Sequence, residues 1–302
     1  MPQTLRQLPW LLRRTLVASI DDGLFALAKG VAYSGLLCLF PVLTSAAAIS
    51  VQIRADYVRH KMEAFLSQVV PPGTEDAVLL QFRSSGQRPV GLIVVAALLS
   101  LWAASSVVKS LMDGFNAAYH VPRNRSMGAH IAVGILLVFL ALVPMVGASS
   151  LVLFGGEVER GIMKLWKVDP ILNPLAGSLA LLFRVGRYVI AFSAAWALTA
   201  ILYYFGPFRK QRWRDIWEGA FLATVLWLLA TLGFSWYVRH ITNYNLLYGS
   251  IGTGIALLIW MYLLAIIAMF GCEFNAECER MRVAEAAESG GPPLAARVQP
   301  AP

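Results

Sequence analysis

Charge is scarce in this chain, and its scarcity excludes an ordinary soluble domain. Asp, Glu, Lys and Arg make up 14% of the 302 residues, whereas hydrophobic residues make up 58%. Soluble domains carry about 25% charged residues. The composition is instead typical of a polytopic membrane protein, whose apolar core lies in lipid. We therefore expect an all-α integral membrane protein.

Cysteine and histidine are also too few and too scattered to build a reactive centre. Cys38, Cys272 and Cys278 have neither the paired spacing nor the neighbouring histidine of a zinc site. The histidines are spread over the whole sequence, at His60, His120, His130 and His240. No nucleophile and base are recognisable as a pair. The sequence predicts no catalytic residue, no metal and no cofactor, so we do not expect an enzyme.

The formal net charge is +8, but its distribution does not favour nucleic acid. The basic residues form short clusters between apolar stretches, without a basic stripe that carries stacking aromatics. Cytoplasmic loops and anionic lipid headgroups account for such clusters. We expect membrane lipids as partners and no nucleic acid.

Long uncharged runs are the main positive feature. Residues 251–271 carry no charge, and a helix of that length crosses a bilayer. This last span has glycine and hydroxyl residues crowded at its start, which permits close helix packing. Five further apolar stretches precede it, so the predicted spans are 30–53, 89–111, 131–154, 175–205, 217–238 and 251–271. Pro41 and Pro144 fall inside spans and predict kinks.

Amphipathic and polar segments flank the predicted membrane domain, which covers residues 30–275. Residues 1–29 combine arginines with an apolar face, which is typical of an interfacial helix. A signal peptide does not fit, because Asp21 and Asp22 stand where small cleavage-site residues are needed. Further amphipathic helices are expected within 54–88 and at 158–166. The remaining 276–302 are expected to form a disordered cytoplasmic tail.

One short loop fixes the predicted orientation. Its four basic residues are Arg209, Lys210, Arg212 and Arg214. Short loops rich in Lys and Arg stay in the cytoplasm. With six spans, both termini then lie on the cytoplasmic side.

Several short motifs recur in a fixed order along these spans. They are Ala32-Tyr33 with Leu39-Phe40-Pro41, Trp102-Ala103-Ala104-Ser105 with Asn116-Ala117-Ala118-Tyr119, Gly206-Pro207 with Trp213-Arg214 and Gly219-Ala220, Tyr248-Gly249 with Trp260, and Gly271-Cys272-Glu273-Phe274-Asn275. Over residues 20–278 the chain resembles the YihY/virulence factor BrkB family of bacterial inner-membrane proteins. Cys38 and Cys272 depart from the serine and alanine that the family usually has there.

The resemblance implies a multi-pass protein of the bacterial inner membrane, associated in some members with envelope integrity. Members have also carried a ribonuclease label. The scattered histidines argue against that label, because phosphodiester hydrolysis at a metal needs clustered ligands.

Two functions are compatible with the sequence. The first is transport of a lipid or other envelope component along a path lined by polar side chains. The candidate residues are Tyr33, Ser105, Asn116, Arg184, Arg187, Tyr248, Ser250, Thr253, Glu273 and Asn275. The ordinary alternative is that hydroxyls pack helices, tyrosines lie at interfaces and arginines reach headgroups. The second function is a scaffold that does not transport and that holds envelope proteins or further copies of itself.

Charge placement narrows the transport hypothesis. The middles of the spans contain almost no ionisable group, which disfavours a proton-relay pump. Glu273, at the end of the last span, is expected to be partly desolvated and therefore to hold a basic partner. The candidate partners are Lys109, Arg123, Arg125 and Arg214. Alternatively, Glu273 is a solvated helix-end charge like Glu277 in the tail.

Overall fold

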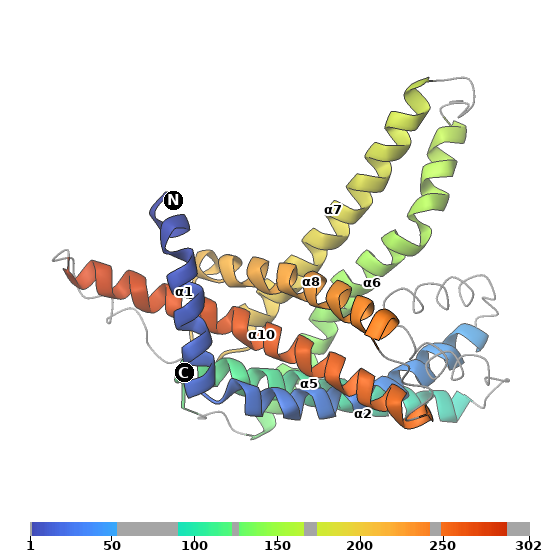
Figure 1. The fold of residues 1–302 in the computed structure, drawn as a ribbon. Helices are drawn as coiled ribbons and strands as arrows, with labels where there is room; N and C mark the ends of the chain where they lie inside the picture. The colour runs from blue at the N-terminus through green and yellow to red at the C-terminus, as the bar shows by residue number, and fades with distance from the viewer. Residues whose placement is uncertain (1, 53–89, 123–126, 166–173, 242–248, 289–302) are drawn as a thin grey trace.

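The computed structural model describes residues 2–52, 90–122, 127–165, 174–241 and 249–288, and this part of the chain contains helices and no strand (Figure 1). The all-α prediction is confirmed. The helices are α1 (Pro2–Asp21), α2 (Leu24–Gln52), α5 (Val90–Ala118), α6 (Met127–Leu165), α7 (Pro174–Phe205), the 3-10 turn η1 (Trp213–Asp215), α8 (Trp217–Ile241) and α10 (Gly249–Glu288).

Six of the described helices are long and apolar enough to cross a membrane, as the sequence predicted. Their apolar windows are Leu24–Ser45, Ile93–Ala118, Gly128–Gly147, Leu181–Phe205, Trp213–Val238 and Gly254–Glu285. Helices α2 and α6 continue through Pro41 and Pro144, so neither proline ends its helix. The kinks themselves remain predictions.

Some predicted boundaries were wrong. The amphipathic piece at 158–166 is not separate, because α6 runs without a break to Leu165. The second predicted span was too short at its end, because the apolar window of α5 runs to Ala118 and Lys109 packs its aliphatic stem against α6. A Cβ built on Gly134 of α6 would lie 3.1 Å from Cγ of Lys109. The amphipathic segment within 54–88 lies outside the described residues.

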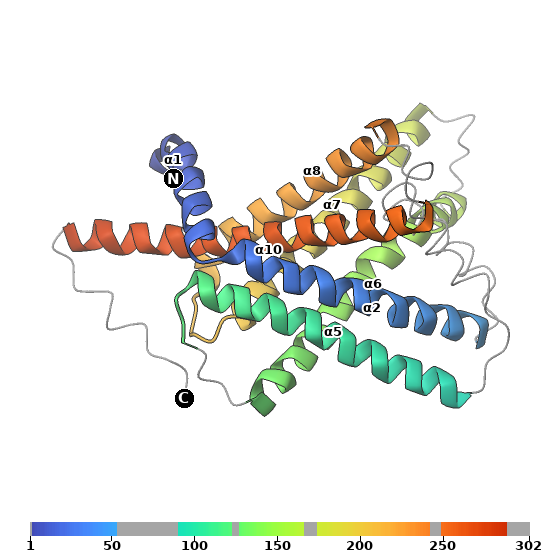
Figure 2. The ribbon, with the colours of Figure 1, turned by 60° about the horizontal axis from the view of Figure 1, so that its bottom comes forward.

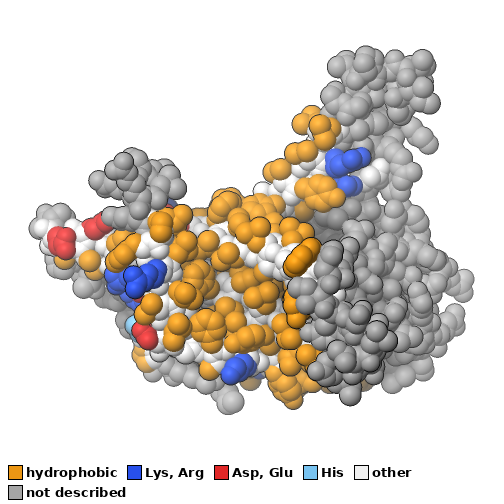
Figure 3. Space-filling view, viewed as in Figure 1, with side chains coloured by type: hydrophobic (Ala, Val, Ile, Leu, Met, Phe, Trp, Pro, Cys, Tyr) orange, Lys and Arg blue, Asp and Glu red, His pale blue; other side chains and the backbone are white. Residues whose placement is uncertain are grey.

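Helix α10 is the centre of the molecule and packs against α1, α2, α5 and α8 (Figures 1 and 2). Buried residues lie on several sides of it, including Ala256, Trp260, Ala265 and Met269. A helix that is apolar all round is suited to such a central position. Hydrophobic side chains also cover the middle of the face shown in Figure 3, where lipid is expected to surround the bundle.

The end of α10 differs from the sequence prediction. A disordered tail was expected from residue 276, but α10 stays helical to Glu288, so the prediction was wrong for residues 276–288. The physical reason is that this part of the helix is packed. Cys278 forms a buried cluster with Phe274 and with Leu11 of α1. Residues 289–302 lie outside the described part.

Helices α6 and α7 form an arm that leans away from the other helices (Figure 1). The C-terminal half of α7 contacts α8 through aromatic rings. The ring centroids of Trp196 on α7 and Trp217 on α8 are 5.1 Å apart, and those of Phe192 and Phe221 are 5.9 Å apart. Towards its N-terminus α7 separates from α8, and Val185 is exposed there. The two helices therefore diverge as they leave this aromatic contact.

Candidate functional site

A cavity of about 260 Å³ lies in the bundle, next to the point where α7 and α8 diverge. Five helices supply its wall, which consists of Val31, Gly35, Val107, Leu111, Thr199, Ala223, Thr224, Trp227, Met261, Leu264, Ala265, Ile267 and Ala268. The hydroxyls of Thr199 and Thr224 donate to the carbonyls of Ala195 and Ala220 on their own helices, at 3.0 and 2.8 Å. The cavity therefore offers an apolar surface to whatever enters it.

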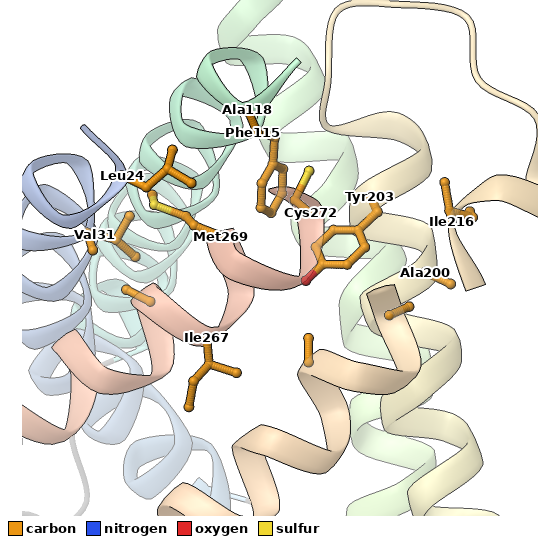
Figure 4. Close-up of a cluster of buried hydrophobic side chains, with 14 residues drawn as sticks. Leu24, Val31, Phe115, Ala118, Ala200, Tyr203, Ile216, Ile267, Met269 and Cys272 are labelled. Carbon is orange, nitrogen blue, oxygen red and sulfur yellow. The ribbon is translucent and has the colours of Figure 1, made fainter. Parts of the chain in front are cut away.

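A densely packed group of side chains closes one end of this cavity, and we call it the sealed end (Figure 4). Phe115 and Tyr203 are buried there with their rings edge to face, 5.3 Å apart. The hydroxyl of Tyr203 donates a 2.6 Å hydrogen bond to the carbonyl of Ala268, which lines the cavity. Met269 and Cys272 are fully buried in the same group. Van der Waals packing therefore separates the cavity from this end of the molecule.

Glycines allow the helices to cross closely at the sealed end. A Cβ on Gly219 of α8 would lie 2.1 Å from the carbonyl oxygen of Gly271 on α10. A Cβ on Gly271 would lie 2.5 Å from the hydroxyl of Tyr203 and 2.6 Å from Cβ of Ala223. Because only glycine fits at such a crossing, these two positions set the spacing of α8 and α10.

Beyond the sealed end, residues 273–282 of α10 form what we call the polar end segment. Arg280 is its central residue. Its Nη1 lies 2.9 Å from Oε1 of Glu273 and also contacts Glu277, while its Nη2 donates to the carbonyl of Ala118 at the end of α5. Arg14 of α1 places Nε 2.5 Å from Oε2 of Glu277. The segment thus ties α10 to α1 and to α5.

Arg209, in the chain between α7 and α8, also contacts the polar end segment. Arg209 donates to Glu279 at 2.6 Å and lies over the ring of Tyr119, 4.3 Å from its centroid. Burial raises the pKa of Tyr119 well above its usual range, so Arg209 meets a neutral phenol. The arginine therefore joins α10 to the end of α5 as well.

Arg282 of α10 binds the start of α8. Its Nη1 lies 2.7 Å from Oδ1 of Asp215, and its Nη2 lies 2.9 Å from Oε2 of Glu218. A single ten-residue stretch of α10 thus contacts α1, α5, η1 and α8 at this end.

Two predicted path residues, Asn275 and Asn116, hold backbone groups. The Oδ1 of Asn275 accepts a 2.7 Å hydrogen bond from the N–H of Gly219, and its Nδ2 donates to the carbonyl of Ile216. Asn275 therefore caps the first turn of α8 from a neighbouring helix. The Oδ1 of Asn116 accepts a 2.7 Å hydrogen bond from the N–H of Phe208. Both amides fix the connection from α7 to α8.

The remaining candidates are dispersed. Tyr33 is 62% exposed and points out of the bundle, whereas Ser105 is buried and donates to the carbonyl of Trp102. Arg184 is exposed, and Arg187 is half-buried with its guanidinium 5.3 Å from the ring centroid of Tyr188. None of these described side chains lines the 260 Å³ cavity.

The other predicted path residues lie outside what the structure describes. Tyr248 lies outside the described residues, as do the side chains of Ser250 and Thr253 at the start of α10. A substrate path along these ten positions remains a prediction.

The partner of Glu273 differs from the prediction. Its basic partner is Arg280 on the same helix, not Lys109 or Arg214, while Arg123 and Arg125 lie outside the described residues. The alternative of a solvated charge was also wrong, because the side chain of Glu273 is 0% exposed and that of Glu277 is 4% exposed. The reason is that α10 stays helical, so a residue seven positions on returns to the same face.

A second, more peripheral cavity of about 430 Å³ lies between α2, α5 and α6. It is lined mostly by apolar side chains such as Leu98 and Phe139. The hydroxyls of Ser45 and Ser100 meet there at 2.8 Å. Because these hydroxyls also satisfy carbonyls of their own helices, this cavity is apolar as well.

The part of the chain that the structure describes has six apolar spans, and α2, α5 and α8 pack against α10, which is the last of them. The profile of the family described as Virulence factor BrkB matches residues 16–295. The chain belongs to this family. The YihY/BrkB resemblance seen in the sequence is therefore confirmed, and the match covers the whole predicted membrane domain, residues 30–275.

The relatives in this family are distant. A ribonuclease-like protein of Bacillus subtilis (strain 168), YfkH, is 28% identical over 249 residues, which cover 81% of this chain and 86% of YfkH. A UPF0761 membrane protein of Tolumonas auensis is 26% identical over 262 residues, which cover 84% of this chain and 80% of that protein. No solved structure matches. One of these names says ribonuclease-like and the other says only membrane protein, so the names leave the chemistry of the family open.

Proposed function

We propose that this BrkB family protein is a carrier for a lipid or another amphiphilic component of the bacterial envelope. The observation that carries the proposal is the apolar cavity of about 260 Å³ beside the diverging helices α7 and α8. Five helices surround it, and its two hydroxyls are already satisfied. Burying a polar solute there without partners is unfavourable, whereas an acyl chain needs no hydrogen bonds.

The asymmetry of the cavity supports movement between leaflets. One end is closed by Phe115 and Tyr203, and on the other side the α6–α7 arm leans away. A carrier alternates between two such arrangements. If the loop containing Arg209 is cytoplasmic, the sealed end faces the cytoplasm in this conformation. We propose that orientation, with both termini in the cytoplasm and the protein in the inner membrane.

Membrane lipids share similar acyl chains, so a carrier that selects among them has to recognise the headgroup. Arg184 and Arg187 lie one turn apart on the part of α7 that has separated from α8. Guanidinium groups bind phosphate and carboxylate strongly. We propose that these two arginines contact the anionic headgroup of a lipid while the acyl chain of that lipid reaches towards the cavity.

A liposome assay tests the proposal directly. The protein is reconstituted with fluorescent phospholipids, and exchange between leaflets is followed by quenching from outside. Thr199→Phe fills the cavity and is expected to slow exchange to the rate of empty liposomes. Val189→Phe, on an exposed part of α7, is the matched control and keeps the wild-type rate. Exchange by Thr199→Phe at the wild-type rate would overturn the cavity assignment.

The headgroup contact has its own test in the same assay. Wild type is expected to move anionic phospholipids faster than zwitterionic ones, and Arg184→Gln with Arg187→Gln is expected to remove the difference. No exchange by correctly folded wild-type protein with any lipid would contradict the carrier proposal.

A scaffold is the second candidate function. The specific observation that favours it is the exposed apolar surface of α1, where Trp10, Val17 and Ile20 are 51%, 50% and 59% exposed. Such a surface binds the membrane interface or a partner helix. Wild-type protein without exchange activity that nevertheless co-purifies with a stable partner, lost in Trp10→Ser, would favour this function.

A further inference from the structure

A mixed cluster of charges surrounds Glu273 beyond the sealed end. The carboxylates of Asp22, Glu273 and Glu277 face the guanidinium groups of Arg14 and Arg280 and the imidazole of His120. The members come from α1, from the turn before α2, from the end of α5 and from α10. The cluster therefore joins α1, the start of α2 and the end of α5 to α10.

The contacts within the cluster are direct but incomplete. His120 places Nε2 2.8 Å from Oδ1 of Asp22 and Nδ1 3.4 Å from Nη2 of Arg280. Within the described part of the chain, Oε2 of Glu273 and Oδ2 of Asp22 are buried and have no hydrogen-bond partner. Arg280 contacts both Glu273 and His120, and His120 contacts Asp22, so the carboxylates of Glu273 and Asp22 belong to one cluster and repel each other when both are ionised.

The charges of the cluster do not cancel when all its carboxylates are ionised. With every carboxylate ionised and His120 neutral, three negative groups face two positive groups. One more proton makes the cluster neutral. The proton also provides a hydrogen-bond donor next to Oε2 of Glu273 and Oδ2 of Asp22, which are buried without a donor. Neutralising a buried carboxylate removes the large cost of keeping its charge away from water.

Glu273 is the best place for that proton. Its side chain is 0% exposed, whereas His120 is 63% exposed and can exchange its hydrogen bonds with water. The thiol of Cys272 is its other titratable neighbour on α10, and Arg209 acts on that thiol from the α7–α8 connection. A thiol keeps its own proton to higher pH than a carboxyl group does, and a guanidinium stays charged, so neither group takes the place of Glu273 as the site of the extra proton.

We propose that this cluster is a proton-binding site in which Glu273 carries the proton, and that loss of the proton loosens the sealed end. Ionised Glu273 would repel Asp22 and Glu277, which belong to the turn before α2 and to the contact with α1. The sealed end would then open more readily at high pH. The site lies beyond the cavity, so it is a control point and not part of a relay through the membrane.

The proposal predicts a proton linkage with a definite sign. An unfolded glutamate is ionised above about pH 5, so the folded protein holds one proton more than the unfolded chain at neutral pH. Stability therefore falls as pH rises through the titration of this site. The unfolding midpoint of wild type in nanodiscs is expected to fall between about pH 6 and about pH 9, outside the range of ordinary carboxyl groups.

Two variants separate Glu273 from its neighbours. Glu273→Gln keeps the shape and resembles the protonated form, so it is expected to fold and to lose most of the fall with pH. Glu279→Gln is the matched control on the same helix, because Glu279 is fully paired with Arg209 and should leave the pH profile unchanged. If His120→Gln removes the fall and Glu273→Gln does not, the assignment to Glu273 is wrong.

Infrared spectroscopy provides a test that already has force in the wild type, without any variant. Wild type at neutral pH is expected to show a C=O stretch of a protonated carboxylic acid, and this band should disappear as the pH rises. Glu279→Gln should keep the band, and Glu273→Gln should lack it. A wild-type spectrum without the band would overturn the proposal.

Opening of the sealed end can be read from Cys272, which is 0% exposed there. In a background with serine at Cys38 and Cys278, its rate of modification is divided by the rate for free glutathione at each pH. The ratio is expected to rise with pH in wild type and to stay flat in Glu273→Gln. A flat ratio in wild type would show that the proton does not control closure. None of these tests uses a transported lipid, so the carrier proposal can fail or succeed independently.

Discussion

The side chain of Asn275 on α10 completes the first turn of α8 by accepting a 2.7 Å hydrogen bond from the N–H of Gly219. The same amide donates to the carbonyl of Ile216 at 3.0 Å. A polar residue that appears available for substrate in the sequence is therefore occupied by the backbone of another helix. This relationship holds the start of α8 against α10, at the sealed end.

Removal of the Asn275 amide should destabilise the protein more than removal of the Asn116 amide. Asn275→Leu removes the acceptor of the buried N–H of Gly219, at a cost of about 1 to 3 kcal/mol, while the carbonyl of Ile216 still accepts from the N–H of Ala220. Asn116→Leu removes a hydrogen bond that is only partly buried, at a smaller cost of about 1 kcal/mol. The measurement is the free energy of unfolding in detergent. Equal losses in the two variants would contradict the capping role of Asn275.

The crossing of α8 and α10 should tolerate no added methyl group. Gly271→Ala places a Cβ 2.5 Å from the hydroxyl of Tyr203, so we expect a loss of about 3 kcal/mol or more. Gly233→Ala on α8 is the matched control, because nothing lies within 4 Å of its added Cβ, and it should be neutral or stabilising by up to about 1 kcal/mol. Folded yield and thermal midpoint measure both. A mild effect at Gly271 would mean that the helices can separate without penalty.

Arg280 should be the most sensitive arginine of the polar end segment. Arg280→Met leaves buried acids without their partner, and breaking such a pair costs about 3 to 5 kcal/mol. Arg212→Met is the control, because Arg212 is exposed. Adding Glu273→Gln and Glu277→Gln to Arg280→Met should recover part of the loss. If the triple variant is no more stable than Arg280→Met, the acids do not cause the destabilisation.

The orientation of the chain can be tested at Lys210, which is exposed in the short basic loop. In a background without native cysteines, Lys210→Cys should resist an impermeant thiol reagent in intact cells and react once the inner membrane is permeabilised. Labelling of intact cells from outside would reverse the proposed topology, and with it the side on which the sealed end lies.

Hydropathy was sufficient to predict the spans. The apolar runs gave six of them, and the uncharged stretch at 251–271 correctly stood out, since α10 packs against four other helices. Span ends were less predictable, since the second span was expected to end at residue 111 and its apolar window runs to Ala118, past two charged residues. In the structure the stem of Lys109 packs near Gly134, and Asp113 lies 3.7 Å from Nε2 of His130.

The contacts of the polar residues could not be read from the sequence. Glu273 and Arg280 are seven residues apart and share a helix face, but a charge-rich terminus also fits a solvated tail. Residue type likewise does not reveal whether an amide such as Asn116 binds a substrate or a backbone group. The cavity wall was missed because Thr199 and Thr224 are isolated hydroxyls in apolar helices, which most often only bond to their own turn.

Helix α10 has 40 residues and α6 has 39, so each is about 60 Å long at 1.5 Å per residue. The hydrocarbon core of a bilayer is about 30 Å thick. The excess of α10 emerges on the side of α1, and that of α6, beyond its apolar window at Gly147, emerges on the opposite side. If each of these helices crosses the bilayer once, we expect the protein to protrude into water from both faces of the membrane, within reach of soluble proteins in either compartment.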